Sequence, residues 1–145
     1  MTEVYIINES PFELPAYATI ASAGVDLKAF LDKPINLKPL ERKIIATGIK
    51  LALPEGYEAQ VRPRSGLAAK YGISILNSPG TIDSDYRGEI GVILVNLSNQ
   101  VFTINRGDRI AQLVLTKYEK INWKIIEELP ETKRGIGGFG STGEK

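Results

Sequence analysis

The chain has 145 residues, of which 43% are hydrophobic and 24% are charged, and this fits a single domain that buries roughly two thirds of its unfolded surface. Its net charge of +1 gives no overall field to attract nucleic acid or acidic lipid. No apolar run approaches the ~20 residues of a membrane span, and the N-terminus carries no signal pattern. We therefore expect a cytoplasmic protein that binds neither nucleic acid nor membranes.

Histidine and cysteine are both absent from the sequence. Disulfides, thiolate metal sites and cysteine nucleophiles are therefore excluded. A general base must come from Asp or Glu, because Lys and Tyr are poor alternatives at neutral pH. Any metal must be a hard cation held by oxygen atoms, and Mg²⁺ is the first candidate.

The first half of the chain contains several short runs that are rich in β-branched residues or alternate apolar with polar residues, with glycine and proline between them. Such runs predict the strands of an all-β sandwich or barrel. Asp26 lies within the first of them and, taken alone, is an ordinary polar residue facing solvent. The predicted strands are residues 25–30, 43–53 and 57–62.

One short helix is predicted from Gly66 to Tyr71. Ser65 is a good N-cap, and Gly72 can close the helix in the left-handed conformation. Arg64 and Ser65 place a guanidinium and a hydroxyl beside unpaired N–H groups, which is a suitable arrangement for phosphate. A capped helix with a solvent-exposed arginine explains the same residues equally well.

The segment from Gly80 to Glu89 places the carboxylates of Asp83 and Asp85 and the phenol of Tyr86 on a short turn between two strand-like runs. Because the chain has no histidine, Asp83 is the first candidate for a general base. The runs beside this turn, and the one after it, predict strands at residues 73–76, 90–97 and 101–104.

The stretch from Asp108 to Leu129 lacks Gly and Pro and is compatible with a helix. Ile121, Trp123 and Ile125 alternate as in a strand, so we expect a strand here. Gln112 is compatible with an ordinary polar strand position. Two arginines, Arg87 and Arg109, are candidates for structural or interface ion pairs.

Residues 130–145 contain almost nothing that can join a core, and Phe139 stands among alternating glycines. A linker or a frayed end is the commoner explanation of such a tail. Alternatively, Arg134 and the Ser141–Thr142 pair could lie along a phosphate chain while Phe139 stacks on a base.

Five segments in this order resemble the five motifs of the homotrimeric dUTPases, the deoxyuridine triphosphate nucleotidohydrolases. Each motif alone is a weak signal, but five in order make chance agreement negligible. The resemblance covers nearly the whole chain. The matching segments are Ala23–Leu27, Pro63–Leu67, Gly80–Glu89, Gly107–Leu113 and Arg134–Gly143.

The resemblance implies an all-β fold, a distorted jelly-roll β-barrel with one short helix and a flexible glycine-rich C-terminal arm. It divides the chain into a barrel domain, residues 1–129, and an arm, residues 130–145. The family is a homotrimer with shared active sites. One subunit supplies the first, second and fourth motifs, a neighbour supplies the third, and the remaining subunit supplies the arm.

The family mechanism implies that Asp83 deprotonates a water molecule for in-line attack on the α-phosphorus of dUTP. The products are dUMP and pyrophosphate. Mg²⁺ is the implied cofactor, held by the phosphates and, through water, by Asp26. The residues implied to bind the phosphates are Arg64, Ser65, Gly66, Gln112, Arg134, Gly140, Ser141 and Thr142, and Phe139 is implied to stack on the uracil.

The family also implies that a hairpin from Asn77 to Gly91 selects the base and sugar. Its backbone would read the uracil edge, close approach would exclude the thymine methyl group, and Tyr86 would obstruct a ribose 2′-hydroxyl. The residues concerned are Asn77, Gly80, Thr81, Ile82, Tyr86 and Gly91. Two alternatives stay open: a dCTP deaminase, with or without dUTPase activity, and a non-catalytic nucleotide-binding trimer.

Overall fold

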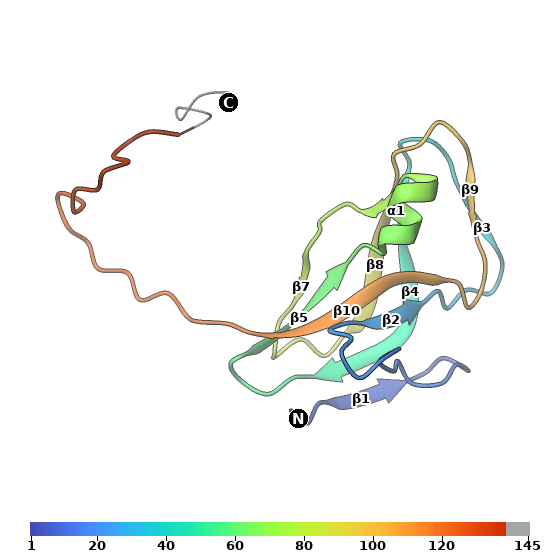
Figure 1. Ribbon diagram of the computed structural model, residues 1–145. Helices are drawn as coiled ribbons and strands as arrows, with labels where there is room; N and C mark the ends of the chain where they lie inside the picture. Colours follow the sequence, from blue (N-terminus) through green and yellow to red (C-terminus); the bar gives the residue numbers. More distant parts are fainter. Residues whose placement is uncertain (139–145) are drawn as a thin grey trace.

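A computed structural model of the protein describes residues 1–138. Its regular secondary structure consists of strands and one short helix, in agreement with the all-β prediction (Figure 1). One sheet has the strand order β1-β4-β8-β6, with every neighbouring pair antiparallel. Its strands are β1 (Tyr5–Asn8), β4 (Arg42–Ala52), β8 (Glu89–Asn96) and β6 (Ile73–Ile75).

The second sheet has the order β2-β10-β5-β7 and is also antiparallel throughout. Its strands are β2 (Val25–Lys28), β10 (Arg109–Lys117), β5 (Tyr57–Arg62) and β7 (Gly80–Ile82). A two-stranded ribbon of β3 (Ile35–Leu37) and β9 (Phe102–Ile104) completes the fold. The sheets do not close on each other, which gives a distorted, jelly-roll-like barrel.

A single hydrophobic core joins the two sheets and the ribbon. Leu27 of β2, Ile45 of β4 and Val92 of β8 are fully buried in it. The alternation expected for half-buried strands is clear in β5, where Ala59 and Val61 are buried and their neighbours Glu58, Gln60 and Arg62 are not. Alternation therefore located most of the strands to within a few residues.

The predicted helix is present as α1 (Ser65–Tyr71). Gly72 closes it with φ 64°, as expected for a residue in the left-handed region. The predicted N-cap was wrong, because Arg64 occupies that position and Ser65 is the first helical residue. Arg64 makes no side-chain capping bond, since its guanidinium is engaged elsewhere.

The long strand predicted from Asp108 to Leu129 is only half correct. Strand β10 ends at Lys117, and residues 118–138 contain no helix or strand. This segment leads away from the barrel (Figure 1), and the side chains of Trp123 and Ile125 are exposed. Within residues 1–138, no helix is long and apolar enough to cross a membrane.

Candidate active site

Asp26 lies at the centre of a cluster of charged side chains on the second sheet. Its Oδ1 accepts a hydrogen bond from Arg64 Nε at 2.9 Å, and its Oδ2 accepts one from Arg109 Nη1 at 3.2 Å. Arg64 also donates from Nη1 to the carbonyl oxygen of Arg109. We call Asp26, Arg64, Arg109 and Gln112 the phosphate cluster, after the ligand that the resemblance implies. Two guanidinium groups surround one carboxylate, so the cluster has a net positive charge and suits an anion.

Gln112 joins the phosphate cluster through the register of the strands. It lies opposite Asp26 on one side and opposite Arg62 on the other. Its amide donates from Nε2 to the carbonyl oxygen of Pro63 at 2.8 Å. A Cβ atom at Gly24 would lie 2.8 Å from Gln112 Oε1, so only glycine at position 24 permits this placement of the amide.

Ser65 and Gly66 follow Arg64 as the first two residues of α1 and are exposed. A Cβ atom built at Gly66 would have no neighbour within 4 Å. The fold itself therefore does not require glycine at this position. A ligand that approaches the backbone of residues 64–66 closely would require it.

Asp83 lies on the exposed loop between β7 and β8, in residues 83–88. A turn closes the loop where Tyr86 N–H donates to the carbonyl oxygen of Asp83 at 3.2 Å. Tyr86 Oη donates to the carbonyl oxygen of Glu89 at 3.0 Å, and Arg87 donates to the carbonyl oxygens of Ser84 and Tyr86. A polar cavity of about 580 Å³ adjoins Asp83, Asp85 and the start of the C-terminal segment, where Tyr118 and Lys120 lie.

Within a single subunit, Asp83 lies far from the phosphate cluster. In the antiparallel pair β5–β7, Ile82 lies opposite Ala59, so Asp83 continues away from the end of β5 that leads to Arg64. The stretch from Ala59 to Arg64 alone spans about 17 Å at ~3.3 Å per residue. The candidate base and the candidate phosphate ligands therefore occupy opposite ends of β5.

The expected hairpin from Asn77 to Gly91 is not a two-stranded unit in the described structure. Strand β7 pairs with β5, whereas β8 pairs with β4 and β6. A Cβ atom at Gly80 would lie 3.2 Å from Asn77 Nδ2, which brings these two predicted residues together. At Gly91 the space is taken by Ile44, whose Cγ2 would lie 2.7 Å from an added Cβ.

The predicted residues of the C-terminal arm are only partly described. Arg134 donates from Nε to the carbonyl oxygen of Gly137 at 2.8 Å, within a local turn that also includes Thr132 and Gly135. Phe139, Gly140, Ser141 and Thr142 lie outside the described residues.

The donor set of the phosphate cluster fits Mg²⁺ in one way only. Among residues 1–138, no group of three or more acidic, histidine or cysteine side chains could hold a metal ion. Asp26 is a lone carboxylate between two arginines, so it can hold a cation only together with other ligands. Mg²⁺ is commonly bound in this manner, by one carboxylate, retained water molecules and substrate phosphates.

Comparison with known proteins identifies the family of the chain. The dUTPase family model matches residues 10–143. The deoxyuridine 5'-triphosphate nucleotidohydrolase of Finegoldia magna is 57% identical over 97% of this chain and 99% of its own length. The protein of that name from Wolbachia pipientis is 63% identical over 90% of this chain and 86% of its own.

A solved structure is also similar over almost the whole chain. A Staphylococcus bacteriophage 80alpha dUTPase mutant, determined with dUpNHpp, has a TM-score of 0.87 at 25% identity and covers 99% of both chains. With the family match and the curated relatives, this likeness shows that the chain belongs to the dUTPase family.

The sequence did not reveal the partners of the site residues. Arg109 was expected to form an ion pair, and it does, but its partner Asp26 was not foreseen. Arg87 was given the same expectation, whereas its described contacts are hydrogen bonds to carbonyl oxygens of its own loop. The cross-strand register supplies the missing information, because Gln112 on β10 faces Asp26 on β2.

Proposed function

We propose that the protein hydrolyses dUTP to dUMP and pyrophosphate, which limits uracil incorporation into DNA and supplies dUMP for dTMP synthesis. The observation that carries the proposal is the phosphate cluster. Three residues from separate family motifs, Asp26, Arg64 and Gln112, meet there in an arrangement that favours an anion. The names of the curated relatives support dUTP as that anion. We expect the reaction to take place in the cytoplasm.

In this proposal Asp83 orients a water molecule and accepts its proton while the water attacks the α-phosphorus in line. Phosphoryl transfer depends chiefly on positioning and on charge stabilisation. Arg64, Ser65 and Gly66 hold the phosphates beside the bond that breaks, and Gln112 binds near the α-phosphate. Arg134 and residues 140–142 of the arm close on the γ-phosphate, and Phe139 stacks on the uracil.

Asp26 would hold Mg²⁺ through water molecules, as the one carboxylate of the phosphate cluster. The ion would neutralise part of the phosphate charge when bound with the triphosphate. Arg64 is then free to exchange its contact with Asp26 for a contact with phosphate.

Selection of dUTP rests on the segment around β7. Asn77, Gly80, Thr81 and Ile82 offer main-chain and amide groups to the uracil edge, and Tyr86 lies beneath the deoxyribose. Gly91 lies at the edge of the same site in this proposal, although Ile44 already fills the space beside it.

We further propose that the active form is a homotrimer with shared sites. The separation of Asp83 from Arg64 along β5 supports this, because a triphosphate cannot be held by one group and attacked from the other across that distance. A second chain that contributes its own Asp83 would complete the site.

The test is a pyrophosphate-release assay with dUTP, dTTP, UTP and dCTP side by side, with Mg²⁺ and with chelator. We expect turnover of dUTP alone, sharply reduced by chelator. Comparable turnover of UTP or dTTP would contradict the proposed selection. Ammonia release from dCTP would favour the deaminase alternative, and nucleotide binding without turnover would favour the non-catalytic trimer.

A further inference from the structure

Strand β4 contains a bulge where it pairs with β8, the strand that follows the Asp83 loop. The register between β4 and β8 shifts between Ala46 and Lys50, so Thr47 and Gly48 have no ordinary partners on β8. Both residues are buried, and Gly48 has φ 71°. Their main-chain N–H groups would lack acceptors in a dry environment, at a considerable cost in stability, unless a side chain supplied one.

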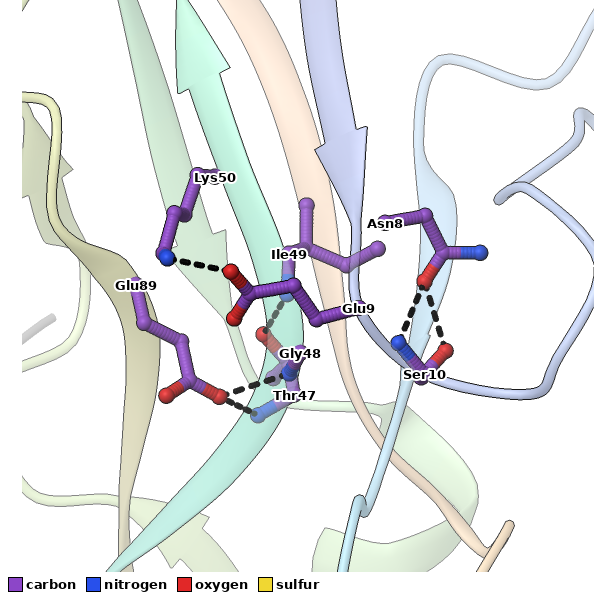
Figure 2. A network of polar contacts seen from close by, with 8 residues as sticks. All are labelled: Asn8, Glu9, Ser10, Thr47, Gly48, Ile49, Lys50 and Glu89. Atoms are coloured by element: carbon purple, nitrogen blue, oxygen red, sulfur yellow. Dashed lines mark hydrogen bonds and ion pairs between the residues drawn. The ribbon is translucent and has the colours of Figure 1, made fainter.

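Glu89 supplies that acceptor. Its Oε1 accepts hydrogen bonds from Thr47 N–H at 3.1 Å and from Gly48 N–H at 2.7 Å (Figure 2). The hydroxyl of Thr47 adds a third link by donating to the carbonyl oxygen of Ile90 at 2.7 Å. The first two residues of β8 are therefore fixed to the bulge, immediately after the loop that carries Asp83 ends.

The same residue is connected to Asp83 through Tyr86. The carbonyl oxygen of Glu89 accepts the hydroxyl of Tyr86, and Tyr86 N–H donates to the carbonyl oxygen of Asp83. Gly88 permits this placement, since a Cβ atom there would overlap the Tyr86 ring. Hydrogen bonds made by Glu89 and Tyr86 thus connect the buried bulge to the main chain of Asp83.

We propose that Glu89 is a positioning residue for Asp83, which it holds in place by fixing the end of the loop to the bulge in β4. The proposal rests on the proposed role of Asp83 as the general base. Glu89 itself touches neither the phosphate cluster nor Asp83 in the described structure, so it acts through Tyr86 and the loop backbone. Its loss should slow the chemical step more than it weakens nucleotide binding.

Glu9 provides a matched control on the other side of the same bulge. Its side chain forms an ion pair with Lys50 (Figure 2), half exposed at the surface. This hydrogen bond raises the pKa of the Lys50 ammonium. Lys50 lies opposite Glu89 in the strand register, but Glu9 itself makes no described hydrogen bond to the Asp83 loop, and it differs from Glu89 in that respect.

The experiment compares three variants: Glu89→Ala, Glu89→Gln and Glu9→Ala. For each variant it measures kcat, the dissociation constant of the dUTP analogue dUpNHpp by calorimetry, and the melting temperature. For Glu89→Ala we expect kcat to fall about tenfold or more, as for a misplaced reacting group, with the dissociation constant changed less than about threefold. Glu89→Gln keeps an acceptor oxygen and should recover most of kcat. Glu9→Ala should leave kcat and binding unchanged. Equal kcat for Glu89→Ala and Glu9→Ala would overturn the inference, as would parallel loss of kcat and binding.

Tyr86→Phe keeps the test decisive if Glu89→Ala does not fold. It removes only the exposed hydroxyl that bonds to Glu89 and leaves the bulge intact. We expect kcat to fall with little change in analogue binding; an unchanged kcat would overturn the inference. The Asp83→Asn variant separates the two proposals: if it stays active, the base assignment fails, and if it is inactive while Glu89→Ala equals the parent, only the positioning role fails.

Discussion

Asp26 and Asp83 are carboxylates of the same chain in opposite surroundings. The side chain of Asp26 is 31% exposed and held between Arg64 and Arg109. Within residues 1–138, the exposed carboxylate of Asp83 has no hydrogen bond or ion pair of its own. The first group is fixed before any ligand arrives, whereas the second depends on its loop for placement. In the proposed mechanism, the phosphate ligands would therefore be preformed and the base would have to be brought to them.

The largest expected effect is that of Asp83→Asn. The amide is similar in size and cannot accept the proton of water, so kcat should fall by the ~10²–10⁴ typical of a lost general base. Binding of dUpNHpp should stay nearly normal, because the phosphate cluster is untouched. The measurement is kcat by pyrophosphate release together with calorimetric binding. Hydrolysis within about threefold of the parent would shift the assignment from Asp83 to Asp85.

The next prediction tests whether the two carboxylates act in different chains. Arg64→Gln and Asp83→Asn subunits should each be nearly inactive alone. In each mixed trimer, about a third of the sites should combine an intact Arg64 from one chain with an intact Asp83 from another.

Activity of the mixture should therefore rise well above that of either parent variant. Refolding the two variants together, separating mixed trimers by a charge tag and assaying dUTP turnover measures this recovery. Mixed trimers that are no more active than the parents would mean that each chain completes its own site.

A smaller effect is expected for Gly88→Ala, which tests the loop rather than the base. The added methyl group would displace the Tyr86 ring and its hydrogen bond to Glu89. We expect kcat/KM for dUTP to fall on the order of tenfold to a hundredfold, as for a displaced site. Selection against UTP should weaken as well, and the ratio of the two kcat/KM values is the measurement. An unaltered ratio would show that Tyr86 does not read the sugar.

The smallest effect is expected for Gly66→Ala, which tests the phosphate cluster. Alanine should stabilise α1 by up to about 0.5–1 kcal/mol relative to glycine, and a Cβ atom at this position meets nothing in the free chain. Close approach of the phosphates should nevertheless be hindered. KM should rise roughly tenfold, equivalent to about 1.4 kcal/mol of binding, while the melting temperature stays the same or increases. An unchanged KM would place the phosphates away from this backbone.

The strands could be predicted where alternation reflects burial on one face. Tyr57–Arg62 was located correctly because Ala59 and Val61 point into the core. The same rule failed after Lys117. Ile121, Trp123 and Ile125 alternate as in a strand, but alternation does not identify the surface that a strand would pair with. Within the described chain these side chains are exposed and pair with nothing.

The sequence indicated which residues are candidates for the site, but it did not indicate their contacts. Asp26 is 38 positions from Arg64 and 83 from Arg109, and no local pattern links such distant residues. The motif resemblance placed Asp26, Arg64 and Gln112 in one active site, but it did not reveal the hydrogen bonds and ion pairs that they form. Glu89 lies at the end of the third motif, but the sequence assigned it no role, because its contacts arise from a bulge in another strand.

The placement of the two half-sites at opposite ends of β5 has a consequence for the amount of protein. If neither half works alone, catalytic output follows mass action and depends on how many chains have assembled. On dilution the total activity should decline faster than the protein concentration, so the specific activity should fall, with a steepness that reports the number of chains in the active assembly. An inhibitor that separates the chains would then abolish hydrolysis, and it would not need to resemble the nucleotide.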